Sequence, residues 1–140
     1  MVNAIDSPLA VSGREVRKTF AREGKESIRA LEDISLEISV GTLAALVGPD
    51  GAGKTTLIRL TAGLMNVDGG ELRVLGVDVS SSPQQVQDRI GYMPQKFGLY
   101  EDLTVQENLD LYAELHGISL EERRNSYPRL MQMTALGPFR

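Results

Sequence analysis

Apolar and polar positions alternate through the first part of the chain and then give way to a continuous apolar run. Short alternations at residues 16–20, 28–31 and 34–38 are typical of half-buried strands and predict an antiparallel β region. Residues 43–47 are apolar throughout, which is the pattern of a central strand buried on both faces. Residues 1–12 are expected to form a mobile N-terminus.

The pattern changes to helical spacing after the apolar run. Leucines recur at helical intervals over residues 54–64, which predicts a helix that ends near a glycine. A strand is predicted over 71–75, a short helix with proline in its first turn over 83–89, and a short strand over 90–93.

Two capping signals follow in the last third of the chain. Residues 104–107 have the composition of a capping box and predict a helix that ends near Gly117. Residues 119–122 repeat the signal. Pro128 lies inside the second helix, so we expect a kink or break near Tyr127.

Composition excludes several classes of function. The 140 residues carry 19 acidic and 15 basic side chains, a net charge of -4, which argues against a nucleic-acid partner because no basic face is implied. No cysteine is present, so disulfides and thiolate metal sites are excluded. No apolar segment approaches the length that spans a bilayer, and residues 1–12 lack the features of a secretion signal, so a cytoplasmic location is expected.

One motif outweighs every other feature of the chain. The segment after the apolar run matches the phosphate-binding pattern G-x-x-x-x-G-K-[ST] at every fixed position, and a predicted strand and helix flank it as the pattern requires. Its residues are Gly48, Pro49, Asp50, Gly51, Ala52, Gly53, Lys54 and Thr55.

The chemistry of a triphosphate explains this spacing. Gly51 and Gly53 allow backbone N–H groups to turn inward and approach the phosphates closely, and the following helix directs its N-terminal dipole at the same anion. We expect Lys54 to contact the β and γ phosphates and to act in catalysis, Thr55 to hold Mg²⁺, and Thr56 to donate to the α phosphate.

Beyond the motif, most of the chain resembles the nucleotide-binding domain of ATP-binding cassette (ABC) transporters. The resemblance is carried by the P-loop neighbourhood, a Gly-Tyr-Met-Pro-Gln segment and the stretch that opens the family's helical subdomain; these lie at residues 46–64, 91–95 and 99–109. It extends from Arg14 to Arg140, and residues 93–105 look closest to the multidrug and drug-efflux exporter branch.

The resemblance implies a fold and two further site residues. The fold is α/β, a P-loop NTPase core with an N-terminal antiparallel β region over 13–96 and the start of a helical subdomain over 97–140. Gln95 matches the glutamine that contacts Mg²⁺ or the attacking water and senses the transmembrane partner, so it is a candidate catalytic and metal-binding residue. Phe20 matches the position of an aromatic that stacks on adenine; a core aromatic at a strand end is the equal alternative.

The family also uses features that these 140 residues do not contain. They are a Ser-Gly-Gly signature, an apolar strand that ends in Asp-Glu, and a later histidine. We therefore expect the chain to be the N-terminal portion of an ABC ATPase, able to bind ATP and Mg²⁺ without efficient hydrolysis by itself. The resemblance implies a transmembrane transporter subunit and a second nucleotide-binding domain as partners, and a peripheral position on the inner face of the cell membrane.

Two other functions stay open at this point. A soluble ABC protein that acts on ribosomes or nucleic acid would share these motifs, although the acidic balance does not favour it. A small P-loop kinase or GTPase would share only the P-loop, and the chain has no Asn-Lys-x-Asp guanine motif.

Overall fold

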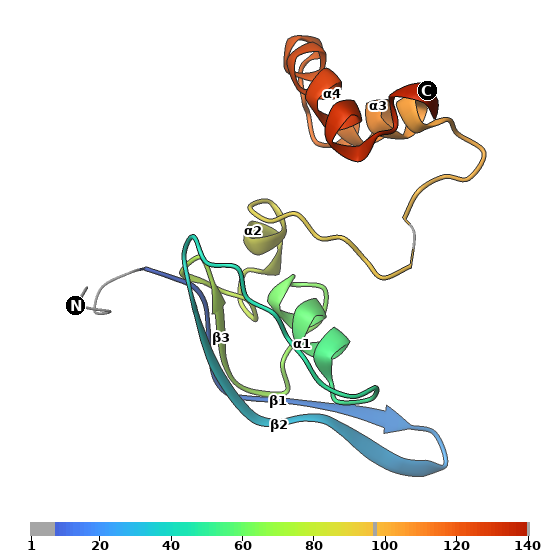
Figure 1. The fold of residues 1–140 in the computed structure, drawn as a ribbon. Helices are drawn as coiled ribbons and strands as arrows, with labels where there is room; N and C mark the ends of the chain where they lie inside the picture. Colours follow the sequence, from blue (N-terminus) through green and yellow to red (C-terminus); the bar gives the residue numbers. More distant parts are fainter. Residues whose placement is uncertain (1–7, 97, 140) are drawn as a thin grey trace. The chain divides into compact units, whose positions relative to one another are not determined.

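The computed structural model describes residues 8–96 and 98–139, which divide into two compact units. The first unit ends at Tyr92 and the second begins at Met93. The first contains the β region and two helices, and the second contains the remaining helices (Figure 1). The fold is α/β, as the sequence predicted.

A four-stranded antiparallel sheet forms the first unit, in the order β2-β1-β3-β4. Two long strands, β1 and β2, run side by side as a ribbon, and β3 pairs with the first part of β1 (Figure 1). The strands are β1 Leu9–Arg22, β2 Lys25–Ser39, β3 Gly69–Val74 and β4 Val77–Asp78; the helices of this unit are α1 Lys54–Thr61 and α2 Pro83–Gln87.

The core of this unit lies where the sheet meets the two helices. Alternation in β1 and β3 turns one set of side chains inward, and α1 adds leucines one turn apart. The fully buried side chains are Val16, Leu60, Leu72, Val79 and Val86. The predicted helix over 54–64 and strand over 71–75 are therefore confirmed within two or three residues of their bounds.

β1 begins earlier than the sequence indicated. We expected a mobile segment through residue 12, but the strand starts at Leu9. Val11 pairs with Ile38 on one side and with Val74 on the other, so hydrogen bonds from two strands order this stretch. The expectation for residues 1–7 lies outside the described residues.

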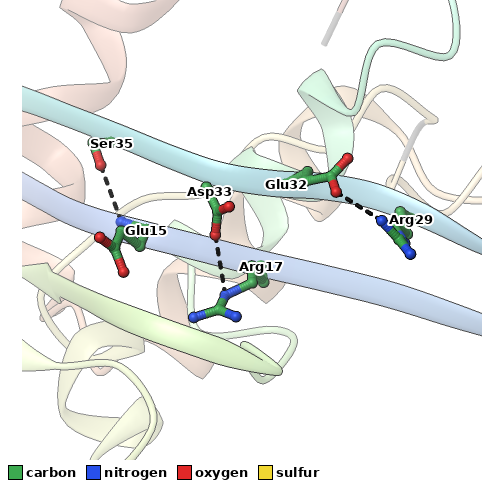
Figure 2. A network of polar contacts seen from close by, with 6 residues as sticks. All are labelled: Glu15, Arg17, Arg29, Glu32, Asp33 and Ser35. Atoms are coloured by element: carbon green, nitrogen blue, oxygen red, sulfur yellow. Dashed lines mark hydrogen bonds and ion pairs between the residues drawn. The ribbon is translucent and has the colours of Figure 1, made fainter.

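The two long strands are irregular near their middle. Glu15 and Asp33 have φ values of 48° and 49°, and the register between β1 and β2 shifts on both sides of Val16. Such bulges add twist and re-aim neighbouring side chains. Figure 2 shows the polar contacts that accompany them: Glu15 N–H to Ser35 Oγ at 3.0 Å, Arg17 Nε to Asp33 Oδ1 at 3.2 Å, and Arg29 to Glu32 at 2.8 Å.

Two predicted strands are wrong. Residues 43–47 and 90–93 are not strands, and Leu43 and Val47 are 102% and 91% exposed. An apolar run becomes a buried strand only where neighbouring strands supply hydrogen-bond partners and cover both faces. None of the described residues pairs with either segment.

The second unit is helical, and local signals fix where its helices begin. Its elements are α3 Val105–Leu115, α4 Leu120–Thr134 and a 3₁₀ turn, η1 Gly137–Phe139. Both predicted capping boxes are present: the Thr104 and Ser119 hydroxyls accept from the third helical N–H, and the glutamates there accept from the cap residues. The Tyr127 hydroxyl donates to Asp110 at 3.0 Å and ties α4 to α3.

We expected a kink or a break near Tyr127, and the break is wrong, because α4 continues through Pro128. The kink stays a prediction. Proline removes one N–H, which leaves the carbonyl of Arg124 without its helical partner. Both residues are exposed, so water can satisfy this carbonyl.

Among residues 8–96 and 98–139, no helix combines the length and apolar composition needed to cross a membrane.

Candidate functional site

The P-loop motif forms a turn that leads directly into α1, which begins at Lys54. Gly51 and Gly53 have φ values of 80° and 81°, in the left-handed region that favours glycine. Ala52 N–H donates to the Pro49 carbonyl at 3.3 Å and closes the turn. The two interior glycines of the motif are therefore required by the backbone path of the loop.

Gly53 is constrained by packing as well as by φ. A Cβ atom there would lie 2.4 Å from the carbonyl oxygen of Ala30 and 2.8 Å from Leu31 Cδ2. At Gly51 nothing lies within 4 Å of the corresponding position. The C-terminal end of the P-loop thus rests directly on β2, whereas its middle faces open space.

The N-terminus of α1 has no side-chain cap. Its cap residue is Gly53, and the first turn contains no acidic residue. The first N–H that bonds within the helix is that of Leu57, to the Gly53 carbonyl at 2.9 Å. The N–H groups of the first turn and the positive end of the helix dipole are therefore available to an anion.

The other two long helices show the contrast. α3 and α4 each begin with a complete capping box, in which a hydroxyl and a carboxylate satisfy the terminal N–H groups. α1 has no such side chains, and it is preceded by a loop in which Gly51 and Gly53 have positive φ. This combination is the arrangement that binds phosphate in P-loop proteins.

Lys54 lies across the P-loop. Its ammonium donates to the carbonyl oxygens of Gly48 at 2.7 Å and Pro49 at 2.5 Å. Thr55, the next residue of α1, is exposed, and Thr56 is half-buried. The P-loop therefore holds one cation on its own carbonyl oxygens, and two threonine hydroxyls follow in the first turn of α1.

The structure does not bring a protein-only metal site to this loop. Among residues 8–96 and 98–139, no group of three or more His, Cys, Asp or Glu side chains could hold a metal ion. The donor set present, a threonine hydroxyl beside a phosphate-binding loop, fits Mg²⁺ that is also bound by phosphate oxygens and water. The assignment of Thr55 to the metal stays a prediction.

Phe20 lies near the end of β1 and is 37% exposed, so it is not a core aromatic. It pairs with Ile28, and Lys18 two residues earlier pairs with Leu31, the residue that contacts Gly53. Residues opposite each other in an antiparallel pair share a face, as do residues two apart in a strand. Phe20 therefore lies on the face of the ribbon against which the P-loop packs.

Gln95 is exposed and belongs to the second unit, in the segment that precedes α3. Its predicted contact with Mg²⁺ or water stays a prediction.

Two residues near Phe20 were missed at the sequence level. The Lys18 ammonium lies 5.8 Å from the centre of the Phe20 ring and donates to Asp68 Oδ1 at 2.7 Å. The Lys18 bond, with the Thr19 N–H bond, holds the pKa of the Asp68 carboxyl below its ordinary value. Alternation could have placed Lys18 beside Phe20, but no local signal links Asp68 to a strand 49 residues away.

Comparison with known proteins identifies the family. A family model described as ABC transporter matches residues 31–138. The chain belongs to the ABC transporter family. This match covers the P-loop, the Gln95 segment and both long helices of the second unit.

Individual relatives of this ABC protein include drug-resistance proteins. The chain is 46% identical over 134 residues to "Probable multidrug ABC transporter ATP-binding protein YbhF" of Escherichia coli, covering 96% of this chain and 22% of that protein. It is 38% identical over 112 residues to "Daunorubicin/doxorubicin resistance ATP-binding protein DrrA" of Streptomyces peucetius, covering 80% and 34%.

A solved structure supports the fold. The dimeric, post-hydrolysis ATP-binding cassette MJ0796 bound to ADP and Pi is similar to this chain, with a TM-score of 0.78 and 28% identity, covering 92% of this chain and 59% of that one.

The chain spans about a fifth of the length of YbhF and a third of the length of DrrA.

Proposed function

We propose that this chain supplies the ATP-binding half-site of an ABC transporter ATPase. The observation that carries the proposal is the uncapped N-terminus of α1 behind a loop of positive φ, with the Lys54 ammonium lying over that loop. A relative's cassette is bound to ADP and Pi, which supports a nucleotide as the ligand.

The loop and the first residues of α1 contact different parts of the nucleotide. The N–H groups of the loop and of the first turn of α1 donate to the phosphates. Lys54 exchanges the carbonyl oxygens of Gly48 and Pro49 for β and γ phosphate oxygens, which carry full negative charge and bind an ammonium more strongly. Thr55 holds Mg²⁺, and Thr56 donates to the α phosphate. Mg²⁺ neutralises charge on the phosphates when it is bound.

We also propose a transport role for the complete protein. The names of YbhF and DrrA support export of a drug or other small molecule as the function of the complete protein. We propose a transmembrane subunit as the partner, contacted by the helical segment that follows Gln95. Gln95 itself would contact Mg²⁺ or the attacking water. A second nucleotide-binding domain, as in the dimeric MJ0796 cassette, completes the site, and the protein lies peripherally on the cytoplasmic face of the membrane.

Calorimetric titration with Mg-ATP tests the binding site directly. Lys54→Ala removes the cation over the loop and is expected to lower ATP affinity at least about tenfold, because charge-assisted hydrogen bonds contribute about 1.5–3 kcal/mol. Arg59→Ala is the matched control, since Arg59 is an exposed base in the last turn of the same helix. Equal affinity in wild type and Lys54→Ala would overturn the proposed site, and a preference for GTP over ATP would overturn the nucleotide assignment.

A further inference from the structure

The carboxylate of Asp68 continues the pairing between β1 and β3 beyond the point where β3 begins. The last β1–β3 pair joins Arg17 to Gly69, and the Asp68 N–H donates to the Arg17 carbonyl at 2.9 Å. Beyond this pair, Thr19 N–H donates to Asp68 Oδ2 at 2.7 Å. A side chain therefore takes the place of a strand carbonyl and fixes the backbone one residue before Phe20.

The second oxygen of the same carboxylate fixes a neighbouring cation. Lys18 donates to Asp68 Oδ1 at 2.7 Å, and the Lys18 side chain is only 14% exposed. Its ammonium lies 5.8 Å from the Phe20 ring centre, within the range of a cation–π interaction. Asp68 thus restrains both the backbone that leads into Phe20 and the cation beside its ring.

A local irregularity connects this arrangement to the P-loop. Between Lys18 and Thr19 the partner residue on β2 shifts from Leu31 to Arg29, so Ala30 is an extra, unpaired residue. The carbonyl of Ala30 is the group that approaches Gly53 most closely. The bulge on β2 therefore adjoins the P-loop and also shifts the pairing of the Lys18–Phe20 segment of β1.

We propose that Asp68 is a positioning residue for the nucleotide base: through Lys18 and the Thr19 N–H it holds the Phe20 ring in one orientation for stacking on a purine. The inference rests on the proposed function, since it assumes that ATP binds at the P-loop. A ring that is already ordered loses less conformational freedom when a base stacks on it, so the restraint raises affinity for the base. It adds nothing to the binding of the phosphates.

Base binding and phosphate binding can be measured separately, which distinguishes a positioning role of Asp68 from a general role in stabilising the fold. Affinities for Mg-ATP and for Mg-bound inorganic triphosphate are measured by calorimetry for wild type, Asp68→Asn, Phe20→Ala and the double variant. Asp68→Asn can still accept from Thr19 but loses the charge that holds Lys18. From the size of an exposed cation–π interaction, we expect ATP to bind about twofold to fivefold more weakly, with triphosphate unchanged.

Asp78→Asn is the matched control. Like Asp68, Asp78 accepts two hydrogen bonds, but both come from backbone N–H groups, of Ser80 at 2.9 Å and Ser81 at 3.0 Å. Its carboxyl pKa is also lowered, mainly by the Ser81 N–H bond. It is the last residue of β4, which pairs with β3 and not with the strand that carries Phe20, so its replacement should leave both affinities unchanged. In the double variant we expect the loss seen for Phe20→Ala and no more, because Asp68 acts through that ring.

The outcomes separate the two levels of the proposal. Equal losses of ATP and triphosphate affinity in Asp68→Asn, no loss at all, or additive losses in the double variant would overturn the positioning role while leaving the P-loop assignment intact. Equal losses for both ligands in Phe20→Ala would overturn stacking on the base. A wild-type chain that binds neither ligand would overturn the proposed function itself.

Discussion

Replacing Gly53 with alanine perturbs two features of the P-loop at once. The residue has a φ of 81°, and a non-glycine residue in the left-handed region costs about 1–2 kcal/mol. The new Cβ would also lie 2.4 Å from the Ala30 carbonyl oxygen, a backbone atom that cannot move aside by changing rotamer. Overpacking of this kind costs about 1–3 kcal/mol, so the two effects together predict a loss of roughly 2–5 kcal/mol in unfolding free energy.

Two other glycines allow the contributions to be separated. Gly76 has a φ of 78° in a turn outside the P-loop, and nothing lies within 4 Å of its Cβ position. Gly76→Ala should therefore show only the backbone cost of about 1–2 kcal/mol. Gly51→Ala should destabilise the fold by a similar amount, since Gly51 also faces open space. It should in addition lower the affinity for Mg-ATP, because its new Cβ lies in the phosphate-binding loop.

Urea unfolding followed by far-ultraviolet circular dichroism measures the stability of each variant, and calorimetry measures Mg-ATP affinity. Gly53→Ala is expected to lose about 1–3 kcal/mol more than Gly76→Ala, and to lose ATP binding, because relief of the overlap requires the loop to move off β2. Equal destabilisation of these two variants would refute the packing of Gly53 against Ala30. Full ATP affinity in Gly53→Ala would refute the role of the loop path in binding.

Three further predictions concern the rest of the chain. Thr104→Ala removes the cap of α3 and should lower the urea-unfolding free energy by about 1 kcal/mol; an unchanged value would contradict the capping role. The lowered pKa of Asp68 stabilises the fold above the ordinary aspartate pKa of about 3.9, and this stabilisation is lost as the pH falls from there through the folded-state pKa. The difference in urea midpoint between wild type and Asp68→Asn should therefore become smaller in acid. A difference independent of pH would contradict stabilisation by the ionised Asp68 carboxylate. Pro128→Ala restores an N–H inside α4 and should raise stability by about 1 kcal/mol or more, with more helical signal; no gain would show that the proline costs nothing there.

Features that depend on a few neighbouring residues could be predicted from the sequence. The capping boxes at Thr104 and Ser119 are complete, because a hydroxyl and a glutamate three residues apart satisfy each other's backbone N–H groups without help from elsewhere. The motif likewise predicted the loop before α1 and its need for Gly51 and Gly53, both of which have positive φ. In each case the signal and the structure occupy the same short segment.

Features that depend on distant residues could not be predicted in the same way. The apolar composition of 43–47 indicates a strand but not which strands pair with it, and no described residue does. Pro128 predicts a break only if losing one hydrogen bond outweighs the rest of α4, and the exposed surface there makes that loss small. The link between Asp68 and Thr19 joins residues 49 positions apart and has no counterpart in local composition.

The two interior glycines of the P-loop show how both kinds of information meet in one motif. At Gly51 the requirement is local, since φ alone disfavours a side chain and the surroundings are open. At Gly53 a second requirement comes from β2, where a bulge turns the carbonyl of Ala30 toward the loop. The same bulge shifts the register by which Phe20 pairs with β2, so the strand irregularity that fixes the end of the phosphate-binding loop also sets the position of the proposed base-stacking ring. A change that removes the bulge should therefore disturb phosphate and base binding together, whereas changes at Gly51 or Asp68 should affect only one of them.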